Sequence, residues 1–296
     1  MVAIALAFVS IAIWSSLALL NSRVNALPPF LAVGVALCVG GLAGLLRAHE
    51  WRVPAKTLAV GIGGIFGYHA MLFAAFRMAP AVEVNLINYL WPLLIVMLSP
   101  VFLRGFRLGL RHVAGALLGL SGAALIVSGG GLGLRAAFVP GYVLAAAAAF
   151  AWAAYSLLTK RLPPFPTGAV GAFCLISGIL SLALYGLERL SSPGLPSLAI
   201  GGREWLFLVL LGLGPMGGAF YAWDAALKRG DPRIIGSLSY LTPLLSTLNL
   251  VAFGGKHLSL GSGIAMSLIV AGAVVGSFDV LRATLTAARR RPGRAP

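Results

Sequence analysis

The sequence predicts an all-α polytopic membrane protein with ten transmembrane helices, arranged as two inverted five-helix repeats. Three observations lead to this fold class: apolar stretches of bilayer length fill the chain, basic residues alternate between the connections, and the two halves share a sequence pattern. Of the 296 residues, 59% are hydrophobic and 10% are charged, whereas soluble proteins carry about 25% charged residues. We therefore expect one membrane-embedded domain over residues 1–296.

Each apolar stretch is long enough to cross a bilayer, which takes roughly 20 residues in helical form. The predicted spans, in chain order, are 2–20, 27–46, 57–77, 81–102, 110–128, 139–159, 168–187, 204–226, 233–253 and 260–280. The connections between them are short, so no soluble domain is left over. Cys38 and Cys174 fall in separate spans and predict neither a disulfide framework nor a metal site.

The distribution of basic residues predicts the orientation. With the N-terminus inside the cell, sixteen of the 22 lysines and arginines fall in inside segments. This excess follows the positive-inside rule and predicts a protein of the inner (plasma) membrane with both termini cytoplasmic, where residues 282–296 form a basic tail. The net charge of +15 is then explained by topology and by contact with anionic lipids, and we expect no nucleic-acid partner.

An internal repeat divides the predicted spans into halves 1–133 and 134–281. A shift of 151 residues brings 61–94 onto 212–245, and both segments contain Tyr-Leu-x-Pro-Leu-Leu. A second shift brings Trp14 onto Trp152 in the first and sixth spans. An odd number of spans in each half turns the second half upside down. Inverted repeats are typical of secondary transporters, whose substrate sites lie near the bilayer midplane.

Motifs of enzymes are absent from the sequence, which contains no HExxH, no Walker loop and no GxSxG. We therefore predict that the chain is not an enzyme and has no cofactor and no metal. Charged residues avoid the centres of the spans. Asp224 precedes Lys228 by four residues, which predicts an ion pair on one helix face, and Arg77 is expected to pair with Glu83 across a short turn.

The fourth span has a polar face. Asn85, Asn88, Tyr89 and Pro92 recur at helical spacing, and Trp91 lies on the flank of that face. Amides that face lipid are unfavourable, so these side chains are expected to point into the bundle or into a wet cavity. Hydrogen bonding between helices and substrate binding both account for them.

Two prolines occupy matching positions in the repeat. Pro92 has no N–H to donate to the carbonyl of Asn88, and Pro243 has none for the carbonyl of Ser239. Both carbonyls are therefore expected to be free near the midplane. Pro92 and Pro243 are candidate hinges, and simple structural kinks are the alternative.

The remaining candidates are aromatic residues and one histidine, deep in several spans. Rings stack on rings, tryptophan attracts an ammonium, and amides and hydroxyls bind a carboxylate, so such a cavity suits a small zwitterion with an aromatic side chain. Structural hydrogen bonding of the histidine and an interfacial aromatic belt are the alternatives. The candidate substrate-binding residues are Trp14, Tyr68, His69, Asn85, Asn88, Tyr89, Trp91, Trp152, Tyr155, Tyr221 and Tyr240.

Four short strings carry a resemblance to a known family. They are Asn88-Tyr89-Leu90-Trp91-Pro92 after Glu83-Val84, Trp152-Ala153-Ala154-Tyr155, Tyr221-Ala222-Trp223, and Ser239-Tyr240-Leu241-Thr242-Pro243. With them the chain resembles the drug/metabolite transporter superfamily, in its EamA-type branch, and more narrowly the YddG-type exporters of aromatic amino acids. The resemblance implies efflux of aromatic amino acids and some toxic aromatic cations through a central cavity to which Tyr68, His69, Tyr89 and Trp91 contribute.

The function expected from these features is that of a secondary transporter. It would export aromatic and other large neutral amino acids across the inner membrane by alternating access. A carrier for cationic drugs, nucleotide-sugars or lipid-linked sugars is the alternative within the superfamily, and a receptor or scaffold without transport is the alternative outside it. The expected partners are a small-molecule substrate and the lipid bilayer, with the chain as a monomer.

Overall fold

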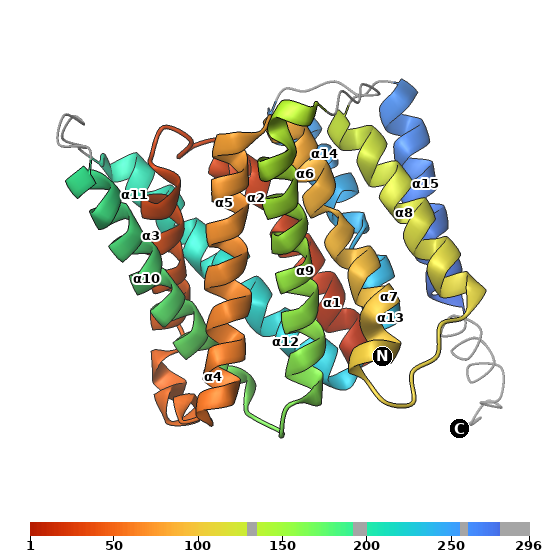
Figure 1. Ribbon diagram of the computed structural model, residues 1–296, viewed down its shortest axis with the longest axis horizontal. Coiled ribbons are helices and arrows are strands. Elements are labelled where there is room, and N and C mark those ends of the chain that lie inside the picture. Colours follow the sequence, from red (N-terminus) through yellow and green to blue (C-terminus); the bar gives the residue numbers. More distant parts are fainter. Residues whose placement is uncertain (129–134, 192–199, 255–259, 279–296) are drawn as a thin grey trace, which may run out of the picture.

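The architecture is a bundle of helices that run side by side, seen here in a computed structural model (Figure 1). The structure describes residues 1–128, 135–191, 200–254 and 260–278. All regular elements within these ranges are helices, and none is a strand. The predicted all-helical class is confirmed. The basic tail 282–296 lies outside the described residues.

The first half of the chain contains long helices that are interrupted by short breaks. Its elements are α1 (Val2–Ser15), α2 (Leu17–Asn21), α3 (Pro29–Leu42), the 3-10 helix η1 (Leu45–Trp51), α4 (Ala55–Ile62), the π-helix η2 (Gly63–Gly67), α5 (Tyr68–Met78), α6 (Ala81–Asn88), α7 (Leu90–Phe102) and α8 (Leu110–Ser128). The elements α4, η2 and α5 follow one another without a gap and form the third predicted span.

The second half follows the same plan. Its elements are η3 (Ala136–Phe138), α9 (Val139–Arg161), η4 (Thr167–Ala169), α10 (Val170–Ser191), α11 (Gly202–Leu213), the π-helix η5 (Gly214–Gly218), α12 (Ala219–Arg229), α13 (Pro232–Leu238), α14 (Leu241–Gly254) and α15 (Leu260–Gly276). The elements α11, η5 and α12 form one continuous span, as α4, η2 and α5 do in the first half.

Eight helices in the described ranges are long and apolar enough to cross a membrane. Together they make the chain a multi-pass membrane protein. The second predicted span is bent by 84° between α3 and η1, and it raises the count to nine if the pair is taken as one span. The tenth predicted span corresponds to α15, whose Gly263–Gly276 segment is apolar but shorter than the others.

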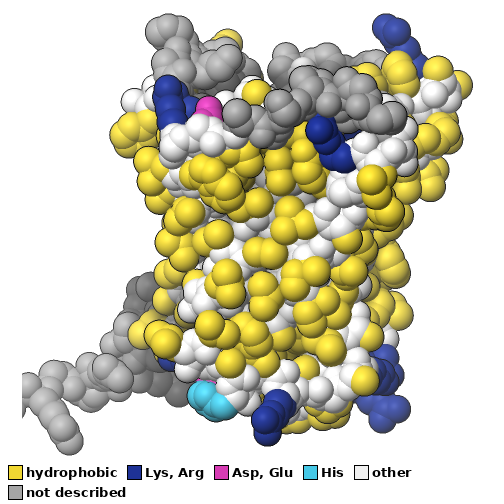
Figure 2. All heavy atoms as spheres, turned by 90° about the vertical axis from the view of Figure 1, so that its left-hand side faces the viewer, with side chains coloured by type: hydrophobic (Ala, Val, Ile, Leu, Met, Phe, Trp, Pro, Cys, Tyr) yellow, Lys and Arg dark blue, Asp and Glu magenta, His cyan; other side chains and the backbone are white. Residues whose placement is uncertain are grey.

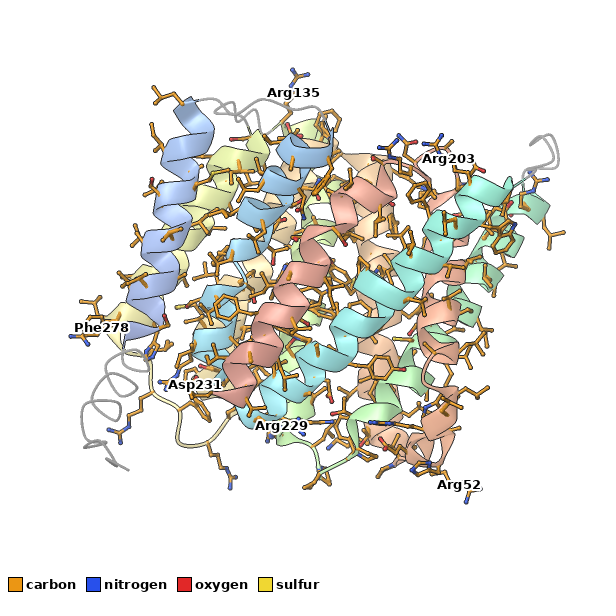
Figure 3. The ribbon with its side chains drawn as sticks, turned by 180° about the vertical axis from the view of Figure 1, so that it is seen from behind. Arg52, Arg135, Arg203, Arg229, Asp231 and Phe278 are labelled. Atoms are coloured by element: carbon orange, nitrogen blue, oxygen red, sulfur yellow. The ribbon has the colours of Figure 1, made fainter. Side chains whose placement is uncertain are left out.

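The surface has the layout of a membrane protein. Hydrophobic side chains cover the middle of the face shown in Figure 2, and Lys and Arg side chains lie toward its two ends. Figure 3 places Arg135 and Arg203 at one end of the bundle and Arg52 and Arg229 at the other. We call these the Arg203 end and the Arg229 end. The basic residues expected outside and inside the cell are thus separated in space.

Several helices begin at prolines, which have no N–H to satisfy and fit the first helical turn. Pro29 opens α3, and Pro232 opens α13. The carboxylate of Asp231 caps α13 by accepting the N–H of Arg233 at 2.9 Å.

The breaks within the helices recur 151 positions apart, at the shift that the sequence repeat indicated. The π-helix Gly63–Gly67 corresponds to Gly214–Gly218. Likewise α7 begins at Leu90 and α14 at Leu241, each after a short helix that ends just before it. π-turns and broken helices often mark functional sites. Here they fall where the two halves meet.

The contacts between helices also correspond between the two halves. α1 packs against α12 as α5 packs against α9, and α1 packs against α14 as α7 packs against α9. α3 lies against α10, and α8 against α15. Exchanging corresponding elements of the two halves therefore maps these contacts onto one another. Some contacts have no counterpart: α13 packs closely against α7, for example, whereas the corresponding elements α6 and α14 make almost no contact.

Two ion pairs test the expectations for charged residues. Lys228 Nζ lies 2.6 Å from Asp224 Oδ2, so the predicted pair is confirmed. Arg77 instead donates from both terminal guanidinium nitrogens to the carboxylate of Glu188, at 2.6 and 3.0 Å, and this joins α5 to α10. The expected Arg77–Glu83 pair is therefore wrong, because the end of α10 brings a carboxylate to Arg77 that sequence distance concealed.

The Arg77–Glu188 pair is expected to contribute little to stability. Its side chains are 51% and 31% exposed, and exposed ion pairs contribute about 0–1 kcal/mol. Arg77→Gln should therefore lower the free energy of unfolding by less than about 1 kcal/mol, measured by thermal or denaturant unfolding in detergent. A loss of several kcal/mol would show that the pair carries more of the fold than its exposure indicates.

Candidate functional site

A cavity of about 400 Å³ lies between the two halves. This volume is within the range of small-molecule binding sites. Its walls come from α1, α2, α5, α6, α7, α8, α9, η5, α12 and α14. The lining residues are Trp14, Leu17, Ala18, Asn21, Tyr68, His69, Leu72, Phe73, Phe76, Asn85, Asn88, Tyr89, Trp91, Val127, Trp152, Pro215, Met216, Phe220, Thr242 and Ser246.

The structure brings together eight of the eleven candidate residues on this wall. They are Trp14, Tyr68, His69, Asn85, Asn88, Tyr89, Trp91 and Trp152. They come from α1, α5, α6, α7, α9 and the break between α6 and α7, so the cavity is built from both halves of the chain.

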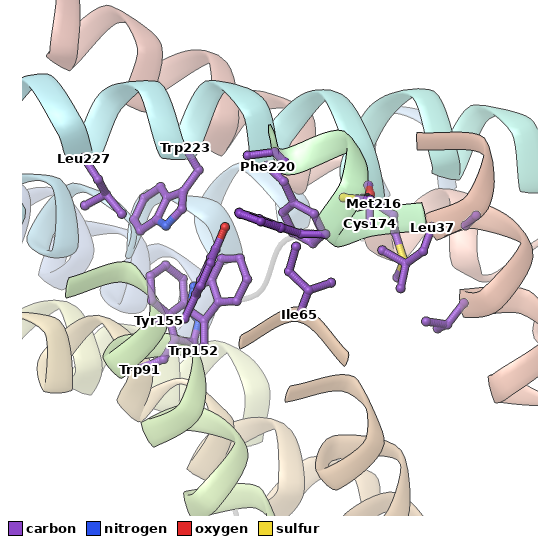
Figure 4. Close-up of a cluster of buried hydrophobic side chains, with 14 of the residues drawn as sticks. Leu37, Ile65, Trp91, Trp152, Tyr155, Cys174, Met216, Phe220, Trp223 and Leu227 are labelled. Atoms are coloured by element: carbon purple, nitrogen blue, oxygen red, sulfur yellow. Dashed lines mark hydrogen bonds between the residues drawn. The ribbon is translucent and has the colours of Figure 1, made fainter. Parts of the chain in front are cut away.

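Tryptophan rings form the base of the cavity. Trp14 and Trp152 have ring centroids 5.8 Å apart, and Trp14 and Trp91 are 6.1 Å apart. Behind them Trp223 lies 5.1 Å from Trp14 and 5.6 Å from Trp91. Figure 4 shows Trp91, Trp152, Trp223 and Phe220 gathered where α7, α9 and α12 meet. Edge-to-face and tilted rings at these distances stabilise one another and present ring faces to a ligand.

Hydrogen bonds fix several of the polar side chains. The indole N–H of Trp14 donates to the carbonyl of Pro215 at 3.0 Å, and the amide N–H of Asn88 donates to the Tyr68 hydroxyl at 3.2 Å. His69 Nδ1 lies 2.7 Å from the carbonyl of Ile65. Since a carbonyl only accepts, Nδ1 carries the proton, and Nε2 is the acceptor of the neutral ring.

Charged side chains are absent from this wall, as far as the described residues define it. Its polar groups are amides, hydroxyls, one imidazole and the backbone. A site of this kind suits a ligand whose own charges cancel and whose bulk is apolar or aromatic. It offers no fixed cation for a phosphate group and no carboxylate for an isolated cation.

The cavity extends toward the Arg203 end. Asn21 at the end of α2 and Asn85 in α6 are exposed at its rim. Toward the Arg229 end the bundle is closed, because Trp223 and Leu227 are packed there and are each only 1% exposed. There Trp223 also donates its indole N–H to Ser156 Oγ at 3.0 Å. The cavity is therefore accessible from one side of the bundle.

Three candidate residues lie outside the cavity. Tyr155 is 3% exposed and packs beside Trp152, with ring centroids 5.4 Å apart. Tyr221 points toward α3, where its hydroxyl donates to the carbonyl of Gly40 at 3.3 Å. Tyr240 is fully buried.

The Tyr240 hydroxyl lies inside the break between α6 and α7. It accepts the N–H of Leu93 at 3.1 Å and donates to the carbonyl of Tyr89 at 3.2 Å. In an unbroken helix the Leu93 N–H would bind the Tyr89 carbonyl directly. A side chain inserted between the backbone N–H and carbonyl groups that would otherwise bind each other is a known cause of a helix break.

The prolines lie just after these breaks. Pro92 and Pro243 occupy the first turns of α7 and α14, and the breaks fall at Tyr89 and at Ser239–Tyr240. The carbonyl of Ser239, expected to be free, accepts the N–H of Thr242 at 3.0 Å. That expectation is wrong because a tighter turn replaces the bond that Pro243 cannot make.

Sequence reasoning missed several lining residues. Phe73 and Phe76 follow His69 at spacings of four and seven, which places all three on one face of α5. That spacing was a usable signal. No sequence signal indicated Phe220, because the π-turn before α12 changes the helical register and brings Phe220 rather than Tyr221 to the cavity.

A multi-pass helical bundle with a ligand-sized, uncharged cavity between two halves is the architecture of a membrane transporter. The sequence pattern of the EamA-like transporter family matches residues 1–128 and again residues 139–278. The chain belongs to this family.

Two named proteins and one crystal structure are similar to this chain over most of its length. The aromatic amino acid exporter YddG of Ancylobacter novellus is 45% identical over 279 residues, which are 91% of this chain and 95% of that protein. The exporter of the same name from Salmonella typhimurium is 29% identical and covers 81% of this chain and 84% of its own length. A crystal structure with 43% identity has a TM-score of 0.87 and covers 95% of this chain and 98% of its own. The two named relatives are exporters of the same transporter family, which confirms that the chain is not an enzyme.

Proposed function

We propose that this protein exports aromatic and other large neutral amino acids across the inner membrane by alternating access. The observation that carries the proposal is the cavity base formed by Trp14, Trp91, Trp152 and Phe220, with uncharged polar groups above it. Rings of a substrate side chain would pack on this base. The names of the relatives, which are aromatic amino acid exporters, support the same substrate class.

The polar groups of the wall would hold the head of the amino acid. His69 Nε2 is an acceptor of the neutral ring and suits the ammonium, while Tyr89 and the Asn85 amide suit the carboxylate. The eight lining candidates are the proposed substrate-binding residues. Tyr155 would act only through Trp152, against which it packs.

Alternating access would come from two inverted five-helix halves, with ten spans and both termini cytoplasmic. Three findings support this arrangement: the same family pattern matches each half, the helix breaks recur at one shift, and the helix contacts pair off between halves. The breaks ahead of Pro92 and Pro243 would be the hinges. The Arg203 end would then face outward, so the cavity in this structure would be open to the outside.

Release from liposomes tests the function. Proteoliposomes loaded with labelled phenylalanine, tyrosine or tryptophan should lose label faster than protein-free liposomes, and labelled glutamate should stay inside. Release equal to the protein-free rate for every aromatic amino acid would refute the proposal. Release of an aromatic cation but of no amino acid would reassign the substrate.

A further inference from the structure

Tyr240 and Tyr89 occupy equivalent positions in the two halves but have opposite surroundings. Each is followed by Leu-x-Pro-Leu-Leu and lies at the break between two short helical segments. Tyr240 is 0% exposed, and its hydroxyl has two backbone partners. Tyr89 lines the cavity, and no hydrogen bond of its hydroxyl is found within the described part of the chain.

The Tyr240 ring packs against α8 at Gly119, which has no side chain. A Cβ added to Gly119 would lie 2.4 Å from Tyr240 Cδ2 and 2.9 Å from its Cβ. A side chain at position 119 would therefore exclude the tyrosine. The ring crosses from the second half into the first, and its hydroxyl holds apart Tyr89 and Leu93 of the opposite broken helix.

This insertion accompanies the closed side of the bundle. α13, which leads into Tyr240, packs closely against α7. The corresponding pair, α6 and α14, is separated, and the cavity lies there, lined by Asn85 of α6 and Thr242 and Ser246 of α14. Tyr240, whose hydroxyl is inserted, thus lies at the closed interface between α13 and α7. Tyr89, which lines the cavity, lies at the open interface between α6 and α14.

We propose that the two tyrosines exchange roles during transport, an inference that rests on the proposed alternating access. When the Arg229 end opens, α13 separates from α7 and Tyr240 withdraws from the α6–α7 break to line the new cavity. When the Arg203 end closes, α6 approaches α14, and the Tyr89 hydroxyl inserts between the Tyr240 carbonyl and the Leu244 N–H. The break filled by a tyrosine then passes from one half to the other.

Each hydroxyl therefore stabilises one state only. Tyr240 makes its two hydrogen bonds in the state seen here, and Tyr89 makes the equivalent two in the opposite state. Removing either hydroxyl should shift the balance of the two states in opposite directions. The two hydrogen bonds contribute about 1 kcal/mol each, which together corresponds to about a thirtyfold change in the ratio of states.

Cysteine labelling of purified protein in detergent measures that ratio without any substrate. The background replaces Cys38 and Cys174 by alanine. One reporter is Ala18→Cys, an exposed cavity residue toward the Arg203 end. The other is Ala3→Cys, which is 9% exposed and packs against Gly230 toward the Arg229 end. The ratio of the two maleimide labelling rates then follows the ratio of the two states.

Tyr240→Phe should lower the Ala18-to-Ala3 labelling ratio about thirtyfold, and Tyr89→Phe should raise it about thirtyfold. The double variant should return to within about twofold of the starting ratio, because both states lose the same bonds. Tyr221→Phe is the matched control, since it removes a hydroxyl bound to the Gly40 carbonyl, away from both breaks. Its ratio should not change.

An unchanged ratio in Tyr89→Phe, or a shift in the same direction as Tyr240→Phe, would overturn the exchange. A purely structural Tyr240 predicts that outcome, since Tyr89 makes no bond to lose in the state seen here. Amino acid release is measured on the same variants. Absence of release with opposite ratio shifts would refute the proposed function alone, and normal release with unshifted ratios would refute the exchange alone.

Discussion

Trp152→Ala should abolish most export of aromatic amino acids and should also destabilise the fold. The Trp152 ring is 3% exposed, and its centroid lies 5.3 Å from Phe220 and 5.4 Å from Tyr68. Removing it leaves a large void among rings, and such truncations cost about 3–5 kcal/mol. A substrate ring loses its packing partner as well, worth about 1.4 kcal/mol or more, so KM should rise at least about tenfold.

A second variant separates folding from binding. Trp152→Phe keeps an aromatic face and should keep most of the fold, yet it should still raise KM because the ring is smaller. Trp205→Ala is the matched control, since Trp205 is 46% exposed at the start of α11 and is not part of the cavity. Its KM should equal that of the natural protein. Efflux is measured per folded protein, with unfolding temperature recorded for each variant. An unchanged KM in both Trp152 variants would exclude this cavity as the substrate site.

The aromatic cavity could be predicted because the sequence repeat indicates how deep in the membrane its residues lie. Trp14 and Trp152 match in the repeat, and Asn88 and Tyr89 share one helix face with Trp91 on its flank, so their position near the midplane followed from spacing. What spacing does not give is the direction of a side chain after an irregular turn. Tyr221 was expected in the cavity, but the π-turn at Gly214–Gly218 rotates α12 and directs Tyr221 to α3.

Tyr240 shows a second limit of sequence reasoning. Its pattern matches that of Tyr89, so the sequence predicts the same surroundings for both. The structure holds one arrangement of the two halves, in which one tyrosine is inserted in a helix and the other faces the cavity. A symmetric sequence does not encode which state is occupied. The difference arises from packing between α13 and α7, which is a property of the conformation.

Gly40→Ala should destabilise the protein by about 2 kcal/mol, within the range of about 1–3 kcal/mol for overpacked sites. A Cβ at Gly40 would lie 2.8 Å from the Gly212 carbonyl oxygen and from Gly217 Cα, and 2.9 Å from the Met216 carbonyl oxygen. All three are backbone atoms, which do not move aside as a flexible side chain does. The helices α3 and η5 thus touch backbone to backbone, as small residues allow in membranes.

The clash should also reach the cavity, because η5 carries part of its wall. Pro215 of η5 accepts the Trp14 indole N–H, so displacing η5 weakens the bond that orients Trp14. Gly63→Ala is the matched control: a Cβ there meets nothing within 4 Å. Alanine favours the helix over glycine by up to about 1 kcal/mol at both sites, so Gly63→Ala should be neutral or stabilising. Denaturant unfolding in detergent and efflux per folded protein are compared. If Gly40→Ala is as stable as Gly63→Ala, α3 and η5 do not pack as closely as described here, and the support proposed for Trp14 is lost.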